Sequence, residues 1–382
     1  MPSPHEPEGP QGLGERQSRR GRKACQVRAC GRVAQLALFA FALMLAPAPA
    51  SGTPSPVITV SATGDITLGS HGRYPAGGAA ALLGGVRRYL RGDLVLGNLE
   101  TVLADESLAA KLGASPHCPK PPDPCFRFVA PESFARGLRS IGFTMLNLAN
   151  NHAADLGIVG ESMTIGALAR AGLVSTGRPH QVAQVTVGGT RVAVIGAAPY
   201  PWTQNLLDVP GTARLVRHAA QSNDVVIVTM HLGAEGVTQS HVRPGMEYFF
   251  SEQRGDPIRF THAMVDAGAD LVVGHAPHVL RGLEWYRGRL IAYSLGNFSG
   301  YRTLNTTGDL GASAVLRVTL DSDGRFLKGR VIPLRLDAVG KPRIDPTHRA
   351  WQLLRQLSRT DFGARAARLT PGGEILPPAA HR

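Results

Sequence analysis

The sequence predicts an α/β fold. Short apolar segments alternate with segments of helical spacing, in the order β-α-β-α-β-α followed by further strands. Several of the apolar segments run directly into an Asp, Glu, Asn or His residue. In α/β proteins, ligands bind beyond the carboxyl ends of the strands. The pattern therefore predicts both the fold class and the place of a site.

Five short apolar segments predict buried strands, at residues 57–60, 93–96, 143–148, 224–230 and 270–273. Helical spacing between them predicts helices at residues 76–91, 131–142, 158–171, 214–220 and 257–268. Turn residues predict hairpins over residues 182–195 and 283–293. Two more strands, at 312–320 and 326–336, and a helix at 348–358 complete the chain, and we expect the residues after about 362 to be loose.

The N-terminus has the pattern of a secretion signal. Seven basic residues within residues 1–32 precede an uncharged apolar run, Val33–Ala46. Its length fits the apolar core of a signal peptide and is short for a membrane span. Ala48-Pro49-Ala50 offers a cleavage site. We therefore expect an exported protein that works outside the cytoplasm or at the cell envelope, with residues 1–50 as a cleaved signal or, alternatively, an uncleaved anchor.

The sequence predicts one domain in the exported part. Residues 51–56 predict a linker, residues 57–345 the domain, and residues 346–382 a C-terminal helix and tail. Residues 104–130 form a polar, Pro-rich stretch that is too long for an ordinary connection, so we expect a surface insertion. It contains Cys118 and Cys125, which predict a disulfide in an exported protein. Two free thiols or a metal knuckle are the alternatives.

The charge of the chain is basic, with a formal net charge of +13. Residues 1–32 hold seven basic and three acidic residues, so +4 of this charge lies in the targeting region. The remaining basic residues look scattered along the sequence, and no basic stripe alternates with aromatic residues. We therefore do not expect nucleic-acid binding.

Polar residues at the predicted strand ends are of metal-binding types. They are Asp65, Glu100, Asn151, His152, His231, His275 and His278. Carboxylate, carboxamide and imidazole groups suit divalent ions such as Mn²⁺, Fe²⁺ or Zn²⁺. With one histidine set aside, six ligands exceed the need of one tetrahedral zinc and match two metals that share a carboxylate. The remaining histidine could protonate a leaving oxygen.

The last of these strands ends in Gly274-His275-Ala276-Pro277-His278. Pro277 fixes its own φ angle and favours an extended Ala276. We expect the resulting stiff loop to hold the two imidazoles at a defined separation, as a metal site requires.

Six motifs occur in order along residues 57–300: GDITL, GNLET, ANNHAADLG, HLGAE, GHAPHVL and YSLGNF. This set resembles the bacterial CapA family, which is linked to capsule and poly-γ-glutamate synthesis. That family is similar in fold to the calcineurin-like metallophosphoesterases. The resemblance implies a four-layer αββα sandwich with two metal ions at the carboxyl ends of the strands.

The resemblance also implies roles for single residues. The implied metal ligands are Asp65, Glu100, Asn151, His231, His275 and His278. His152 is the implied proton donor, oriented by Asn150 and Asp155. Residues expected to support the ligands or to face the substrate are Asn98, Glu235 and Asn297.

The chain departs from the wider superfamily in three places. Thr67 stands where the first motif usually has a histidine, so one metal could be held differently. The closing pair is His-x-x-His, as in the CapA family, where the superfamily has His-x-His. Arg281 stands where the family often has a glutamine, and we expect it to face an anionic substrate or the solvent.

Two functions follow from this resemblance. The first is a dimetal-dependent phosphoesterase-type hydrolase acting on a phosphoester or an anionic capsule or envelope polymer. The second is a non-catalytic component that binds the polymer within a capsule-synthesis membrane complex. A nucleic-acid binder would rest on charge alone.

Overall fold

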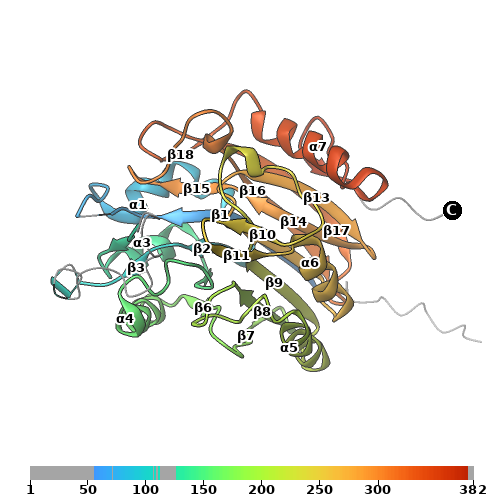
Figure 1. Cartoon of the computed structure of the whole chain (residues 1–382), viewed down its shortest axis with the longest axis horizontal. Coiled ribbons are helices and arrows are strands. Elements are labelled where there is room, and N and C mark those ends of the chain that lie inside the picture. The colour runs from blue at the N-terminus through green and yellow to red at the C-terminus, as the bar shows by residue number, and fades with distance from the viewer. Residues whose placement is uncertain (1–55, 71, 106, 109–110, 112–125, 377–382) are drawn as a thin grey trace, which may run out of the picture. The chain divides into compact units, whose positions relative to one another are not determined.

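Two β-sheets pack face to face, and helices cover the outer face of each (Figure 1). The computed structural model describes residues 56–70, 72–105, 107–108, 111 and 126–376. The predicted signal, most of the linker, and Cys118 and Cys125 lie outside these residues. Within the described residues, no helix is long and apolar enough to cross a membrane.

The first sheet contains the strands from the amino-terminal half and the last strands of the chain. Its order is β18 (Pro342–Ile344), β17 (Phe326–Leu336), β16 (Ala312–Asp321), β1 (Val57–Thr67), β2 (Leu94–Leu99), β5 (Met145–Asn147) and β6 (Val174–Thr176). Strands β1, β2, β5 and β6 run parallel, and β16 to β18 pair antiparallel. Two short strands, β15 (Asn297–Gly300) and β19 (Glu374–Ile375), pair with β1 and β17.

The second sheet is built from the middle of the chain. Its order is β13 (Leu280–Tyr286), β14 (Arg289–Leu295), β12 (Leu271–His275), β9 (Val225–His231), β8 (Thr190–Ala197) and β7 (Ala183–Val187). The four inner strands are parallel, and the predicted hairpins supply the antiparallel edges β7 and β13. The carboxyl ends of both parallel sets carry the candidate site residues.

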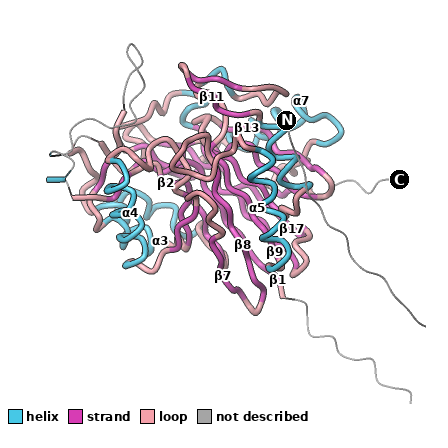
Figure 2. Tube along the Cα trace, turned by 60° about the horizontal axis from the view of Figure 1, so that its bottom comes forward, coloured by secondary structure: helices cyan, strands magenta, loops and turns pink. Residues whose placement is uncertain are grey.

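Helices form the two outer layers (Figure 2). On the first sheet these are α1 (Gly78–Leu83), the 3₁₀ helix η1 (Gly84–Tyr89), α3 (Phe134–Ile141) and α4 (Gly157–Arg170). On the second they are α5 (Val209–Ser222) and α6 (Pro257–Asp266). Both α5 and α6 begin at an Asp whose carboxylate accepts a backbone N–H, followed by an early proline. The four-layer αββα prediction is confirmed.

Strand β9 shows why its sequence reads as a continuous apolar run. Val225 and Ile227 face the core between the sheets, whereas Val226 and Val228 face the helices. Successive side chains of a strand point to opposite faces, so a strand covered on both sides must be apolar throughout. By the same alternation, the side chain of His231 is on the same face of β9 as Val225 and Ile227, which is the face toward the other sheet.

Three elements differ from the sequence predictions. The helix expected at 214–220 is α5, which begins earlier because Asp208 caps it. The helix expected at 76–91 divides into α1 and η1 at Gly84-Gly85. The expectation of a loose tail is wrong for residues 363–376. After α7 (Arg349–Phe362), Ala367, Leu369 and Ile375 are buried in the core between the sheets.

The base of the predicted insertion is a two-stranded pair. Strand β3 (Val102–Leu103) runs parallel to β4 (Val129–Ala130), with backbone hydrogen bonds from Val102 to Phe128 and from Ala104 to Ala130. The insertion therefore leaves and re-enters the domain at one place. That place adjoins the Asn-His segment after β5, because Phe128 contacts His152. Two further short strands, β10 (Glu247–Phe249) and β11 (Glu252–Gly255), form a separate hairpin.

The sheets approach each other closely where β8 ends. A Cβ atom added to Gly196 would lie 2.1 Å from the Asn147 Oδ1 atom of the first sheet. We predict that Gly196→Ala lowers the free energy of unfolding by about 1–3 kcal/mol, because a well-packed interior does not absorb the overlap. Chemical denaturation measures this change.

Gly84→Ala is the matched control. A Cβ atom there meets nothing within 4 Å, and Gly84 has a helical φ of −58°. If the two variants were equally stable, the close approach of the sheets at Asn147 would be wrong.

Candidate metal centre

The carboxyl ends of strands from both sheets meet at one buried place. Asp65, near the carboxyl end of β1, is paired in register with Asn98 of β2, and His231 of β9 is paired in register with His275 of β12. The Asn98 Nδ2 atom lies 3.2 Å from the His231 Nδ1 atom, which joins the two sheets. All four side chains are fully buried.

Asp65 is at the centre of this cluster. Its Oδ1 atom lies 3.7 Å from the His275 Nδ1 atom, and its Oδ2 atom lies 3.3 Å from the His278 Nδ1 atom. The Asn98 side chain and the backbone N–H of Ala276 donate hydrogen bonds to it, at 2.8 Å and 3.3 Å. Ligand atoms of Asp65, Glu100 and His278 all lie within 4.8 Å of one another.

Several ligand atoms of this cluster are buried without a hydrogen-bond partner in the described part of the chain. They are both carboxylate oxygens of Glu100, Asn151 Oδ1, His231 Nε2 and His275 Nδ1. A buried polar atom without a partner costs about 1–3 kcal/mol, so such atoms are rare in native proteins. Carboxylate, carboxamide and imidazole atoms are also the ligands of divalent transition metals. The residues therefore fit a metal centre.

The second nitrogen of His275 is held by the protein. The Thr229 Oγ1 atom lies 3.0 Å from His275 Nε2 and leaves Nδ1 facing Asp65. Metal-binding histidines commonly have their other nitrogen fixed in this way. Thr229 was not predicted from the sequence, although it lies two residues before His231 on the same face of β9.

Burial and the surrounding charges shift the protonation of the cluster. Burial, followed by the charge of Asp65, raises the pKa of Glu100 well above its ordinary range. Burial lowers the pKa of His231, and it lowers the pKa of His275 to about 4. These two imidazoles are therefore neutral near pH 7, with a lone pair free to bind a cation.

Asp65 and His278 form the charged pair of the cluster. Burial alone would raise the pKa of Asp65, but the hydrogen bond and positive charge of His278 hold it below its ordinary value. Burial alone would lower the pKa of His278, but Glu100, Glu235 and Asp65 raise it to about 10. The carboxyl groups of Asp65, Glu100 and Glu235 thus surround one imidazole.

His278 also contacts two residues that were predicted to support the site. Its Nδ1 atom lies 2.7 Å from the Asn297 Oδ1 atom, and its Nε2 atom lies 3.5 Å from the Glu235 Oε2 atom. Glu235 in turn accepts a hydrogen bond of 2.8 Å from Arg254, which is almost completely buried. No sequence pattern marks Arg254, which comes from the separate hairpin strand β11.

A small pocket opens beside His278. Its volume is about 180 Å³, and its lining includes Glu235, Phe249, Asn297 and Leu310. The pocket gives a small group access to the edge of the cluster.

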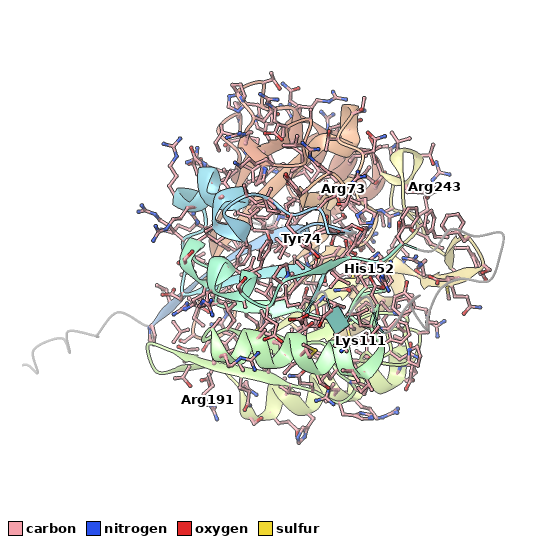
Figure 3. The ribbon with its side chains drawn as sticks, turned by 90° about the vertical axis from the view of Figure 1, so that its left-hand side faces the viewer. Arg73, Tyr74, Lys111, His152, Arg191 and Arg243 are labelled. Atoms are coloured by element: carbon pink, nitrogen blue, oxygen red, sulfur yellow. The ribbon has the colours of Figure 1, made fainter. Side chains whose placement is uncertain are left out.

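His152, which is labelled in Figure 3, belongs to a second group of side chains. Its Nδ1 atom lies 2.9 Å from the Asp155 Oδ2 atom, which also accepts the backbone N–H of Phe128 at 2.7 Å. The rings of Phe128 and His152 are in contact, with centroids 4.2 Å apart. The base of the insertion thus fixes the orientation of this histidine.

Asparagine side chains connect the two groups. Asn98, which donates to Asp65, accepts hydrogen bonds from Asn147 at 2.9 Å and from Asn150 at 3.1 Å. Asn150 then accepts the backbone N–H of His152 at 3.0 Å. Asn147 was missed from the sequence, although it has the same residue type as its neighbours in LNLANNH. Asn151 is adjacent to His152 in the chain, and its Oδ1 atom makes no hydrogen bond to Asp65 or to any other described residue.

The loop between His275 and His278 is not extended as predicted. Ala276 has a φ of +98° and His278 a φ of +57°, in the region that L-residues avoid. The expectation from Pro277 is therefore wrong for Ala276. The turn directs the Ala276 N–H at Asp65, and a non-glycine residue in this region costs about 1–3 kcal/mol.

Arg281 neither faces the solvent nor lines the pocket, so both expectations are wrong. It is completely buried and donates hydrogen bonds to the carboxylate of Glu247, at 2.8 Å and 3.1 Å, and to the backbone oxygen of Gln239 at 2.7 Å. It therefore holds the loop after β9 against β13. Thr67 is also engaged elsewhere, with the backbone of Ser299 and the hydroxyl of Thr303.

Comparison with known proteins places the chain in a family. Residues 59–301 match the family described as bacterial capsule synthesis protein PGA_cap. The chain is 30% identical over 326 residues to the capsule biosynthesis protein CapA of Bacillus anthracis, covering 78% of this chain and 72% of that protein. It is 33% identical over 178 residues to the PGA biosynthesis protein CapA of Bacillus subtilis, covering 42% and 43%.

The chain belongs to the PGA_cap family of bacterial capsule synthesis proteins. The matched region runs from β1 to the end of β15, so it includes all six motifs. Among solved structures, a 5′-nucleotidase precursor from Thermus thermophilus is similar, with 15% identity, a TM-score of 0.40, and coverage of 80% of this chain and 59% of that chain.

We predict that replacing Arg281 by Met lowers the free energy of unfolding by about 3–5 kcal/mol, because Glu247 would lose its buried partner. The matched control is Arg325→Met, which removes an exposed pair with Asp323 and should change stability by less than about 1 kcal/mol. Equal effects of the two substitutions in urea denaturation would contradict the buried contact.

Metal binding predicts a second stability change. Adding Mn²⁺ or Zn²⁺ at about 100 times its Kd should stabilise the protein by about 2.7 kcal/mol, which thermal unfolding measures. His275→Ala should remove most of this gain and leave the metal-free protein folded. A gain of the same size in His275→Ala would show that the metal binds elsewhere.

Proposed function

We propose that this chain is an exported, divalent-metal-dependent hydrolase of the phosphoesterase type, which acts on a phosphoester or an anionic polymer of the capsule or cell envelope. The observation that carries the proposal is that Glu100, Asn151, His231 and His275 bring together buried atoms of metal-binding types that have no hydrogen-bond partner in the described part of the chain. Buried polar atoms are usually hydrogen-bonded in native proteins, and these atoms are also of the types that bind divalent metals.

The proposed metal ligands are Asp65, Glu100, Asn151, His231, His275 and His278. Divalent ions held there, of a kind such as Mn²⁺, Fe²⁺ or Zn²⁺, would act as Lewis acids toward a phosphoryl group and lower the pKa of water. Asp65 contacts both His275 and His278, which makes it the carboxylate best placed to be shared. Asn98 and the Ala276 N–H hold its two oxygens in place.

His152 is the proposed proton donor to the leaving oxygen. Asp155 accepts from Nδ1, which leaves Nε2 as the nitrogen that can exchange a proton with substrate. Phe128 shields the ring and donates its N–H to Asp155, so the pair keeps one orientation. Asn150 fixes the backbone of the same segment and ties it to Asn98.

The proposals of an anionic polymer and of export are supported by other observations. The relatives are named for capsule and PGA biosynthesis, which supports an anionic envelope polymer as the material handled. The basic and apolar N-terminal segment supports export, with residues 1–50 as signal or anchor. A capsule-synthesis complex at the membrane is the proposed setting, and no nucleic acid is proposed as a partner.

A polymer-binding component without catalysis is the alternative. It is favoured by Thr67, which stands in place of a metal-binding histidine and is engaged with Ser299 and Thr303. The metal content of the purified protein separates the two functions. An absence of bound transition metal after loading would exclude the hydrolase and leave the binding function.

The proton donor gives a kinetic prediction. His152→Ala should lower kcat on an aryl phosphate monoester or diester by about 10²–10⁴-fold, because general acid catalysis contributes that much. The metal content should stay unchanged, since His152 is not a proposed ligand. Asp155→Asn should lower kcat less and shift its pH profile, because His152 would lose the carboxylate that fixes its tautomer.

His218→Ala is the control, because this histidine is exposed on α5 in the other helical layer. It should keep full activity and full metal content. Unchanged kcat in His152→Ala would remove this residue from the reaction. Failure of the loaded protein on aryl phosphates and on capsule polymers alike would end the hydrolase proposal.

A further inference from the structure

A hollow lined by basic residues lies at the amino ends of the parallel strands of the first sheet. The metal centre lies at the carboxyl ends of these strands. The volume of the hollow is about 850 Å³, and η1, the loop after it and the end of α3 line it. Four of its lining residues are arginines: Arg87, Arg88, Arg91 and Arg139. Because η1 precedes β2 and α3 precedes β5, the hollow lies at the amino ends of these strands.

The four arginines are exposed and have no carboxylate partner among the described residues. Arg88 lies over the ring of Tyr89, with its guanidinium carbon 4.8 Å from the ring centre. Arg139 makes one long hydrogen bond, of 3.4 Å, to the backbone oxygen of Phe143. Most of their N–H donors therefore face the hollow or the solvent.

Two more arginines extend the charge onto the sheet. Arg317 of β16 and Arg330 of β17 are directly opposite in register. Arg317 donates to the backbone oxygen of Tyr89 at 2.6 Å, which joins this pair to η1. Like charges directly opposite each other destabilise a sheet.

The neighbouring arginines affect the pKa of Arg317. Burial, followed by the positive charges of Arg91 and Arg330, lowers the pKa of its guanidinium below the ordinary value. The sequence expectation that the basic residues are scattered is wrong for this face. The fold gathers residues 87–91, 139, 317 and 330 into one strip, here called the arginine groove.

We propose that the arginine groove binds a segment of a polycarboxylate chain, which is the polymer material on which the metal centre would act. The choice of polymer rests on the proposed function, whereas the existence of an anion site rests on the groove. Guanidinium groups match carboxylates with paired N–H donors, and several adjacent arginines match a chain with a carboxylate on every unit.

Other polyanions fit the groove less well. The aromatic ring beside it, that of Tyr89, is covered by Arg88, so this ring is not open for a base to stack on. None of the exposed large apolar residues of the described chain lines it, so a membrane surface would find no apolar anchor. An extended chain that needs only charge and hydrogen bonds suits it best.

The groove and the metal centre would hold different parts of one chain. Strand β2, Leu94–Leu99, separates them, which corresponds to about 20 Å at about 3.3 Å per residue. A polymer held at the groove would therefore stay attached while another part of it reaches Asp65.

Fluorescence anisotropy of labelled poly-γ-glutamate of defined length, titrated with the full chain, tests the proposal. Arg87→Gln combined with Arg91→Gln should weaken binding about tenfold and flatten its salt dependence, because two ion contacts are lost. Arg214→Gln combined with Arg217→Gln removes the same charge from α5, in the other helical layer, and should change the Kd less than about twofold.

Two results would overturn the proposal. Equal losses in both double variants would show that only the net charge matters, and no loss in the groove variant would show that the polymer binds elsewhere. Single-stranded DNA and vesicles containing anionic lipid serve as competing probes. Tighter binding of either one through the same arginines would replace the polycarboxylate as the ligand.

The same samples separate this proposal from the proposed function. The groove variant should keep its metal content and its rate on a small aryl phosphate, because the groove is remote from Asp65. A protein that binds poly-γ-glutamate through the groove but holds no metal would contradict the hydrolase and support the groove. A protein that holds metal and hydrolyses aryl phosphate, but does not bind poly-γ-glutamate through the groove, would support the hydrolase and contradict the groove.

Discussion

Asp65 is a completely buried carboxylate that no lysine or arginine of the described chain neutralises. Its partners are two imidazoles, the Asn98 side chain and the Ala276 N–H. Removing a charge from water costs several kcal/mol unless it is paired and hydrogen-bonded. The two sheets bring these partners together by ending their parallel strands at the same place, and the other features of the cluster follow from this requirement.

The geometry around Asp65 lowers the stability of the fold. Ala276 and His278 adopt φ angles that L-residues avoid, and Glu100 keeps both oxygens without hydrogen-bond partners in the described part of the chain. Gly196 leaves room for Asn147, whose side chain supports Asn98. Backbone strain and buried polar atoms without hydrogen-bond partners, gathered at one place, are typical of functional sites, where the rest of the fold supplies the stability.

The sequence predicted the parts of the molecule that local pattern controls. The apolar runs and helical spacing located the parallel strands and most helices, and residue type marked Asp65, Glu100, His231 and His275 at the strand ends. Arg254, Thr229 and the buried role of Arg281 were missed because each depends on which distant element packs against it. The extended geometry expected for Ala276 failed because a contact with Asp65, distant in sequence, outweighs the local preference imposed by Pro277. The arginine groove needed the fold as well, since its members are far apart in sequence.

Diffraction from crystals grown with saturating Mn²⁺, recorded at the manganese absorption edge, tests the central claim most directly. A metal centre shared between the two sheets predicts anomalous peaks in contact with Asp65 and with ligand atoms of Glu100, His231, His275 and His278. Two anomalous peaks that are both in contact with Asp65 would show two metal ions bridged by this carboxylate. An anomalous map without a peak beside Asp65 would contradict the metal centre, because the buried ligand atoms without hydrogen-bond partners in the described chain would then need another explanation.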